Sequence, residues 1–259
     1  FQSREKFKPH SVGENTDPIL LSRPSYPPTL HHNRAMNNVT FPVVGIIGAG
    51  AMGRGIAQIA AQAGSVVRLF DTRAEAVSEA VNSITGQWDR MQEKGRLTEG
   101  ALTANKARLK NATQLSDLAD CTLVVEAIVE RLDVKKSLFA ELESIVGPDA
   151  VLTTNTSSLS VTAIAAGLRV PQRFAGFHFF NPVPLMKVVE VIAGLKTSPA
   201  VCDALSRSAR EMGHTPVQAQ DTPGFIVNHA GRGFGTEALR IVGEGVTDFT
   251  TVDRILRDQ

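Results

Sequence analysis

A glycine-rich turn between an apolar run and a helical segment restricts the possible fold more than any other feature of this sequence. The turn, Gly48-Ala49-Gly50-Ala51-Met52-Gly53, directly follows the short apolar run 43–47. Short runs of this kind are typical of strands that are buried on both faces of a parallel sheet. A helix is predicted from about Ala51 to Ala63, where Gly64 would end it. The segment therefore predicts a strand, a tight turn and a helix in succession.

The spacing of the glycines in this turn is typical of a dinucleotide-binding loop. Gly48 would permit the tight turn, Gly50 would let the backbone approach a pyrophosphate, and Gly53 would let helix and strand pack closely. The start of the predicted helix, at Ala51 and Met52, would offer free N–H groups and a partial positive charge to the phosphates.

The choice of cofactor depends on Asp71, which follows the next apolar run, 66–70, and lies 18 residues after Gly53. Its carboxylate can accept hydrogen bonds from ribose hydroxyls and would repel a 2′-phosphate, so it favours NAD over NADP. Arg73, two residues further on, would weaken that preference. FAD-binding proteins share the glycine pattern and remain an alternative.

Strand-like and helix-like segments alternate along the rest of the chain, which predicts an α/β fold with a doubly wound, mostly parallel sheet of the Rossmann type. The charged segment 86–110, with breaks at Gly95 and Gly100, predicts a solvent-exposed helical hairpin inserted into this domain. The other expected elements are strands at Leu123–Ala127, Val151–Thr154 and Phe174–Phe177, and helices at 73–85 and Val134–Val146.

The composition limits the partners and the setting of the protein. A net charge of +1 gives no strong attraction to nucleic acid or to an anionic membrane, and no apolar stretch is long enough for a membrane span. The two cysteines, Cys121 and Cys202, argue against a disulfide framework and favour a reducing, cytoplasmic setting.

Residues 1–42 differ from the rest because they are rich in proline and show no sustained periodicity. We interpret them as a disordered leader or a segment introduced upstream of Met36, the first methionine. An organelle transit peptide is the alternative, which the acidic residues in this segment oppose. His31 and His32 would be available as metal ligands, but we interpret them as part of a solvated leader and predict no metal site.

A histidine among phenylalanines is the candidate general base. Asn181 follows His178 by three residues and Glu190 follows it by twelve. Oxidation of an alcohol by hydride transfer needs a base for the hydroxyl proton, and an apolar setting lets small effects change the protonation of histidine near neutral pH. Glu190 would fix the tautomer of His178 and stabilise its charged form. A structural histidine in the core would show the same pattern.

Several motifs occur after the glycine loop in a fixed order: Asn155-Thr-Ser157-Ser158-Leu, His178-Phe-Phe-Asn181-Pro, Lys187-Val-Val-Glu190 and Asp221-Thr-Pro-Gly-Phe-Ile-Val-Asn228. From about Val43 to its end, the chain thereby resembles the 3-hydroxyacyl-CoA dehydrogenase family. The stretch that begins at Asn228 resembles bacterial members linked to 3-hydroxybutyryl-CoA and phenylacetate-pathway oxidation. The resemblance implies oxidation of an L-3-hydroxyacyl-CoA to the 3-oxoacyl-CoA with NAD as the cofactor.

The resemblance also implies roles for individual residues. His178 would be the general base and Glu190 its partner, whereas Ser157 and Asn228 would hydrogen-bond the reacting oxygen. Asn181 would help to orient His178 or the thioester end of the substrate.

Further roles that the resemblance implies concern the two larger ligands. Glu130 and Lys135 would lie beside the nicotinamide half of NAD, and the helical hairpin would receive CoA. The basic residues of the hairpin are Arg90, Lys94, Arg96, Lys106, Arg108 and Lys110. Simpler interpretations remain open, because 155–158 would also suit a helix cap and Glu126 and Glu130 would also suit a solvated surface.

The end of the chain resembles the beginning of a second domain. We predict an NAD-binding domain at 43–222 and the start of an incomplete helical domain at 223–259, because the 35 residues after Gly224 suffice for about two helices. The resemblance implies a homodimer formed through the complete helical domain. A gulonate-type sugar-acid dehydrogenase and a non-catalytic, crystallin-like NAD-binding protein are the alternatives. A lysine-based enzyme of the 6-phosphogluconate type fits the histidine and glutamate less well.

Overall fold

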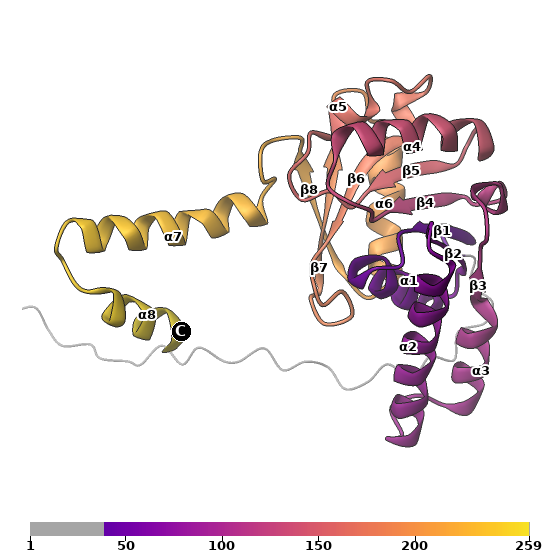
Figure 1. Ribbon diagram of the computed structural model, residues 1–259, viewed down its shortest axis with the longest axis horizontal. Coiled ribbons are helices and arrows are strands. Elements are labelled where there is room, and N and C mark those ends of the chain that lie inside the picture. The colour runs from indigo at the N-terminus through magenta and orange to yellow at the C-terminus, as the bar shows by residue number, and fades with distance from the viewer. Residues whose placement is uncertain (1–38, 259) are drawn as a thin grey trace, which may run out of the picture. The chain divides into compact units, whose positions relative to one another are not determined.

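A sheet of eight strands organises residues 39–258, the part of the chain that the computed structural model describes (Figure 1). In chain order the strands are β1 (Val43–Ile47), β2 (Val66–Phe70), β3 (Leu109–Asn111), β4 (Leu123–Glu126), β5 (Val151–Thr154), β6 (Phe174–Phe179), β7 (Val188–Ala193) and β8 (Thr215–Gln220). Their order across the sheet is β3-β2-β1-β4-β5-β6-β7-β8. Strands β1 to β6 are parallel, β7 is antiparallel to β6, and β8 is parallel to β7. The predicted doubly wound, mostly parallel sheet is confirmed.

The direction in which the sheet grows reverses between β1 and β4. The chain adds β2 and β3 on one side of β1 and then returns to place β4 on the other side. Open α/β sheets bind their ligands beyond the carboxyl ends of the strands at such a reversal. The glycine-rich loop follows β1 at this point, so the fold places it where a cofactor is expected.

Helices before the last two pack on the faces of the sheet, whereas the last two contribute no buried residue. In chain order the helices are α1 (Ala51–Ala63), α2 (Ala74–Glu93), α3 (Glu99–Arg108), α4 (Leu132–Ile145), α5 (Val161–Ala165), α6 (Pro199–Glu211), α7 (Val227–Gly243) and α8 (Phe249–Asp258), with short 3-10 turns η1 (Leu115–Leu118) and η2 (Pro171–Arg173). One apolar cluster joins the strands to α1, α2 and α6, and a second joins them to α4 and α5. Within residues 39–258, no helix combines the length and apolar character needed to cross a bilayer.

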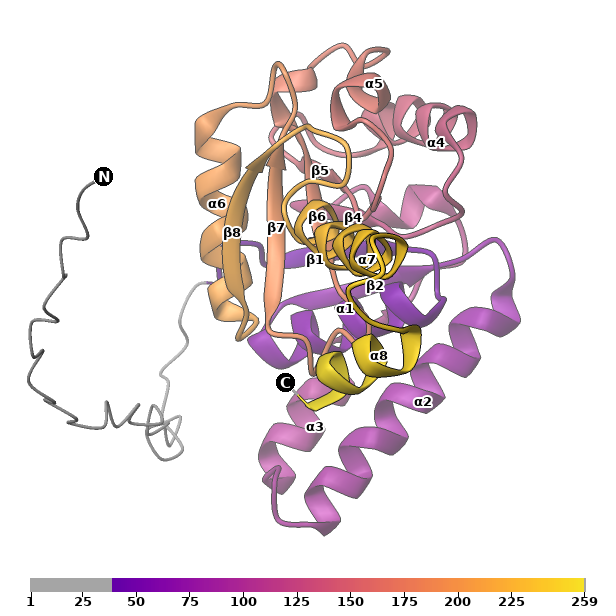
Figure 2. The same cartoon turned by 90° about the vertical axis from the view of Figure 1, so that its left-hand side faces the viewer.

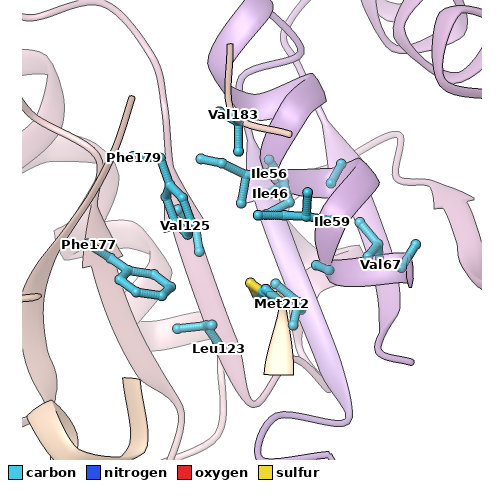
Figure 3. Close-up of a cluster of buried hydrophobic side chains, with 14 of the residues drawn as sticks. Ile46, Ile56, Ile59, Val67, Leu123, Val125, Phe177, Phe179, Val183 and Met212 are labelled. Carbon is cyan, nitrogen blue, oxygen red and sulfur yellow. The ribbon is translucent and has the colours of Figure 1, made fainter. Parts of the chain in front are cut away.

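The first apolar cluster packs helix α1, which begins at the glycine-rich loop, against the sheet (Figure 3). Ile46 of β1 and Ile56 of α1 are both completely buried, and burying a side chain of this size stabilises the fold by about 1.5–3 kcal/mol. Val183, in the segment after β6, packs closely on the same helix, because a Cβ added to Gly55 would lie 2.7 Å from the Cβ of Val183. The segment that follows His178 is therefore packed on the helix that begins at the glycine loop.

The predicted hairpin is present, but its bounds differ from the prediction. Helices α2 and α3 lie side by side in both views (Figures 1 and 2). Gly95, with φ of 65°, lies in the turn between them. Gly100 does not break the structure, because α3 already begins at Glu99, where the side chain of Thr98 caps its first turn. The chain then continues directly into β3, which the prediction had included in the hairpin.

The predicted leader is too long at its carboxyl end. Phe41 is buried, and its carbonyl oxygen accepts a hydrogen bond of 2.8 Å from the hydroxyl of Ser65. The Thr40 N–H and hydroxyl donate to the Glu211 carboxylate at 3.0 and 2.8 Å. Residues 39–42 therefore belong to the folded domain, because an aromatic side chain beside β1 gains stability from burial. The remainder of the predicted leader, with His31 and His32, lies outside the described residues.

Candidate active site

The loop after β1 contains three glycines. Contacts within the chain require glycine at two of these positions, but not at the third. Gly48 has φ of 101°, and a Cβ there would lie 2.5 Å from the carbonyl oxygen of Ala127. A Cβ on Gly53 would lie 1.8 Å from the carbonyl oxygen of Gly48. A Cβ on Gly50 would meet no atom within 4 Å, so packing within the chain does not explain this glycine. Its open backbone suits the close approach of a phosphate group.

The start of α1 is suited to an anion. Gly50 precedes the helix without a capping side chain, and the first turn contains no acidic residue. The first N–H groups of a helix have no acceptor within it, and together with the helix dipole they attract negative charge. Ala51 is exposed and Met52 is partly exposed. These residues therefore fit the pyrophosphate of a dinucleotide.

Asp71 lies directly after β2 and touches the glycine loop. One carboxylate oxygen accepts the N–H of Ala49 at 2.8 Å, and the other accepts the N–H of Arg73 at 3.0 Å. The carboxylate is partly exposed, as binding of ribose hydroxyls would require. Asp71 therefore also supports the shape of the loop, which the sequence did not indicate.

His178 lies near the carboxyl end of β6, directly opposite Glu190 on β7. Side chains at opposite positions of antiparallel strands meet on one face of the sheet. His178 Nδ1 is 2.7 Å from Glu190 Oε2, and His178 Nε2 is 3.2 Å from the hydroxyl oxygen of Ser157. The histidine is 3% exposed and the glutamate is fully buried. The structure thus brings together three of the predicted site residues.

This arrangement determines which ring nitrogen of His178 carries a proton in the neutral form. A carboxylate can only accept, so Nδ1–H donates to Glu190 and the lone pair of Nε2 faces Ser157. The ring centroids of Phe180 and Phe225 lie 4.5 and 5.7 Å from that of His178. These aromatic rings give the imidazole apolar neighbours, in which its interaction with Glu190 is strengthened.

The second oxygen of Glu190 is bound by the backbone at the start of α7. Glu190 Oε1 accepts the N–H groups of Ile226 and Val227, each at 2.8 Å. Phe225, immediately before them, has φ of 48°, which is uncommon for a residue other than glycine. Sequence reasoning missed these backbone donors, because no side-chain pattern marks them.

Glu130 holds the segment that carries Ser157. Its Oε1 accepts the N–H groups of Ser157 and Ser158 at 3.0 and 3.2 Å and also the hydroxyl of Thr156. Burial alone would raise the pKa of Glu130, but the hydrogen bond from Thr156 and the charge of Lys135 together hold this pKa below its usual value. A charged Glu130 therefore fixes the backbone on which the Ser157 hydroxyl depends.

Lys135 is enclosed by two carboxylates. Its ammonium nitrogen is 2.6 Å from Glu126 and 3.2 Å from Glu130, and its side chain is 1% exposed. Glu126 at the end of β4 is fully buried and also accepts the Thr154 hydroxyl at 2.7 Å, so the interpretation of Glu126 as a surface acid is wrong. A buried carboxylate needs such a countercharge. Lys135 is therefore placed to support Glu130, the other residue predicted to lie beside the nicotinamide.

The two predicted asparagines differ in their settings. The side-chain amide of Asn228, in the first turn of α7, donates to the carbonyl oxygen of Ser157 at 3.4 Å. Asn181 is exposed, and within the described residues no hydrogen bond joins its side chain to His178. Asn155, which sequence reasoning considered only as a cap, accepts the N–H of Phe179 at 2.8 Å and so ties the Ser157 segment to β6. The cap of α5 is Ser160 instead of residues 155–158.

Asp221 ties the segment before α7 to the start of α5. Its carboxylate accepts the Ser160 hydroxyl at 2.7 Å and the N–H groups of Val161 and Thr162 at 2.9 and 2.8 Å. Burial alone would raise its pKa, but the hydrogen bonds from Thr162, Ser160 and Val161 outweigh burial and lower the pKa. This contact holds the chain that leads to Phe225.

The basic residues predicted to receive CoA are spread over the hairpin and β3. Lys106 forms an ion pair with Asp89 at 2.6 Å, and Arg108 donates to the Asn105 amide oxygen at 3.3 Å. The others are exposed: Arg90, Lys94, Arg96 and Lys110.

Comparison with known proteins identifies the family. Residues 43–222 match the model of the 3-hydroxyacyl-CoA dehydrogenase NAD-binding domain. The chain is 44% identical over 220 residues to 3-hydroxyadipyl-CoA dehydrogenase of Escherichia coli. The aligned region covers 85% of this chain and 46% of that protein. It is 40% identical over 214 residues to 3-hydroxybutyryl-CoA dehydrogenase of Bradyrhizobium diazoefficiens, covering 83% of this chain and 73% of the relative.

Solved structures lead to the same family. The structure of 3-hydroxybutyryl-CoA dehydrogenase from Escherichia coli matches with a TM-score of 0.78 and 44% identity, over 80% of this chain and 44% of that one. That of (S)-3-hydroxybutyryl-CoA dehydrogenase from Ralstonia eutropha matches with a TM-score of 0.78 and 37% identity, over 82% and 75% of the two chains. The chain thus spans less than half the length of the two Escherichia coli proteins. The matched family model is that of an NAD-binding domain, which agrees with the predicted cofactor. The chain belongs to the 3-hydroxyacyl-CoA dehydrogenase family.

Proposed function

We propose that the protein oxidises L-3-hydroxyacyl-CoA thioesters, such as 3-hydroxybutyryl-CoA, to 3-oxoacyl-CoA with NAD. The observation that carries this proposal is the position of His178 between Glu190 and Ser157, on the sheet whose β1 leads into the glycine loop. The relatives named as 3-hydroxybutyryl-CoA dehydrogenases support the same substrate class.

His178 is the proposed general base. With Nδ1–H held by Glu190, the lone pair of Nε2, which faces Ser157, accepts the proton of the substrate hydroxyl, and the carboxylate stabilises the resulting imidazolium. Ser157 and Asn228 hydrogen-bond the reacting oxygen. Bound NAD would supply the acceptor for the hydride. In the reverse direction, the charged His178 returns its proton to the oxygen of the 3-oxo group.

The proposed cofactor site combines the loop after β1 with the end of β2. Gly48, Gly50 and Gly53, with the first N–H groups of α1, hold the pyrophosphate, and Asp71 binds the adenosine ribose. Glu130 would lie beside the nicotinamide half, and it keeps the Ser157 segment in place.

We also propose that α7 and α8 belong to a helical domain distinct from the domain at 43–222, and that this domain forms a homodimer contact. Phe234, Leu239 and Phe249 are 69%, 65% and 64% exposed, which supports a further apolar contact of these helices. The two cysteines are free and buried, in keeping with the cytoplasmic location that we propose.

The test is the change in absorbance of NADH at 340 nm with three substrates: L-3-hydroxybutyryl-CoA with NAD, gulonate with NAD, and acetoacetyl-CoA with NADH. We expect turnover of both CoA thioesters, a preference for NAD over NADP, and little oxidation of gulonate. Faster oxidation of gulonate would contradict the proposed substrate class. NAD binding without turnover of any substrate would support a non-catalytic protein.

A further inference from the structure

We infer that Ile226 and Val227 are positioning residues for the proposed oxidation: their backbone N–H groups hold Glu190 and partly neutralise it, and so limit how tightly the His178–Glu190 pair binds a proton. The inference rests on the proposed function, in which His178 moves the proton. It assigns a role to the start of α7 in addition to the role of Asn228.

The geometry divides the donors between the two oxygens of Glu190. Oε2 faces His178 Nδ1 at 2.7 Å, whereas Oε1 receives both backbone N–H groups at 2.8 Å. The carboxylate is fully buried, so these contacts replace water as its solvation. The start of a helix also carries a partial positive charge, and α7 is 17 residues long.

Two successive left-handed residues direct these donors towards Glu190. Gly224 has φ of 77° and Phe225 has φ of 48°. A phenylalanine in this conformation persists only where its surroundings determine it, and such residues cluster at functional sites. Phe225 is 5% exposed, and its ring lies against that of His178. One turn therefore places two N–H groups on the carboxylate and an aromatic ring on the base.

Among the described residues, the other groups around Glu190 add no positive charge apart from His178. Strand β8 places Val217 opposite Glu190. The first turn of α7 contributes the neutral Asn228, and His229 is exposed and lies 3.4 Å from the carbonyl oxygen of Pro223. The acidic groups in the neighbouring segments are already bound: Glu130 accepts the N–H of Ser157, and Asp221 accepts the N–H groups of Val161 and Thr162. The two backbone N–H groups are therefore the partners that offset the charge on Oε1.

Loss of one of these donors should raise the proton affinity of His178. The carboxylate would become a stronger acceptor, so the imidazolium of His178 would be stabilised relative to the neutral ring. Hydrogen bonds to charged groups are strong enough that about a tenfold gain in proton affinity is expected. The acidic limb of the pH–rate profile would then rise by about one pH unit.

The experiment replaces the N–H of residue 227 with an ester oxygen, by incorporating 2-hydroxyisovaleric acid in place of Val227. This change keeps the isopropyl side chain and removes one donor to Glu190. It also weakens the carbonyl of Ile226, which accepts the N–H of Ala230 at 2.9 Å. The matched control is lactic acid in place of Ala230, which deletes that helical hydrogen bond and leaves both donors to Glu190.

Two readouts decide the outcome. We expect the ester at 227 to move the His178 Nδ1 proton resonance downfield and the acidic limb of turnover upward by about one unit, with both unchanged in the control at 230. Equal shifts in both proteins, or no shift at 227, would overturn the inference. The proton resonance requires no substrate. A wild-type protein that fails to oxidise any hydroxyacyl-CoA would therefore refute the proposed function without affecting this readout.

Discussion

Replacing Glu190 with glutamine tests how His178, the proposed general base, is held. The substitution preserves the size of a fully buried side chain, but it turns one acceptor oxygen into an NH2 donor. Three N–H groups point at Glu190 in the structure, from His178, Ile226 and Val227. Glutamine has one acceptor oxygen for these three donors, so at least one of them must lose its acceptor.

The structure indicates which donor loses its acceptor. The two backbone N–H groups are fixed by the turn at Phe225, so the amide oxygen remains with them and the new NH2 faces His178. The imidazole must then carry its proton on Nε2, which removes the lone pair that faces Ser157. Loss of the charge also removes a stabilisation of the imidazolium of about 1.5–3 kcal/mol. We therefore expect turnover to fall by about 10²–10⁴-fold, the usual contribution of a general base.

The assay is turnover at 340 nm as a function of pH, together with nitrogen NMR of His178. Glu190→Gln should move the acidic limb to lower pH, because the imidazolium loses its negative neighbour. The NMR spectrum should show the proton of the neutral ring on Nε2, and NAD binding should be preserved. A decrease of less than about threefold with an unchanged pH profile would refute the reasoning.

Four further substitutions test the cofactor loop and the stability of the fold. Asp71→Ala should weaken NAD binding and reduce the difference between the affinities for NAD and NADP in titrations, because the variant loses both hydrogen bonding and repulsion of a 2′-phosphate. A wild type that prefers NADP would contradict this. Gly53→Ala should lower the free energy of unfolding by about 1–3 kcal/mol, since its Cβ would overlap Gly48. Gly50→Ala should stay within about 0.5 kcal/mol of wild type but bind NAD more weakly; equal denaturation curves for the two glycine variants would count against the assignment. Asp221→Asn should be less stable than wild type at pH 7. The difference should shrink as the pH falls below about 4, because a lowered carboxyl pKa contributes stability above the unfolded value that is lost at lower pH; a difference that is independent of pH would exclude this origin.

The core strands could be predicted because burial on both faces of the sheet restricts their sequences. Strands β1, β2 and β5 have the predicted bounds, since a strand covered on both faces needs a short, mostly apolar segment between turn residues. Strands β7 and β8 were not predicted. In β7 the buried Glu190 interrupts the run, and β8 is a largely exposed edge strand that contains Pro216.

The candidate site could be predicted only where side chains carry the signal. The positions of His178, Glu190 and Ser157 in their motifs suggested that they act together, and their short distances agree with that prediction. The donors at Ile226 and Val227 were beyond sequence reasoning, because backbone N–H groups are common to all residues except proline. The burial of Lys135 depends on its ion pair with Glu126. The sequence does not show that Glu126 is buried, because tertiary packing decides this.

The most direct test of the account is the turnover of His178→Ala with L-3-hydroxybutyryl-CoA and NAD, measured beside its NAD affinity. The variant removes the imidazole between Glu190 and Ser157 and leaves the glycine loop untouched. We predict a fall in turnover of about 10²–10⁴-fold with an unchanged dissociation constant for NAD. Near-normal turnover by this variant would contradict the central claim that His178 carries the proton.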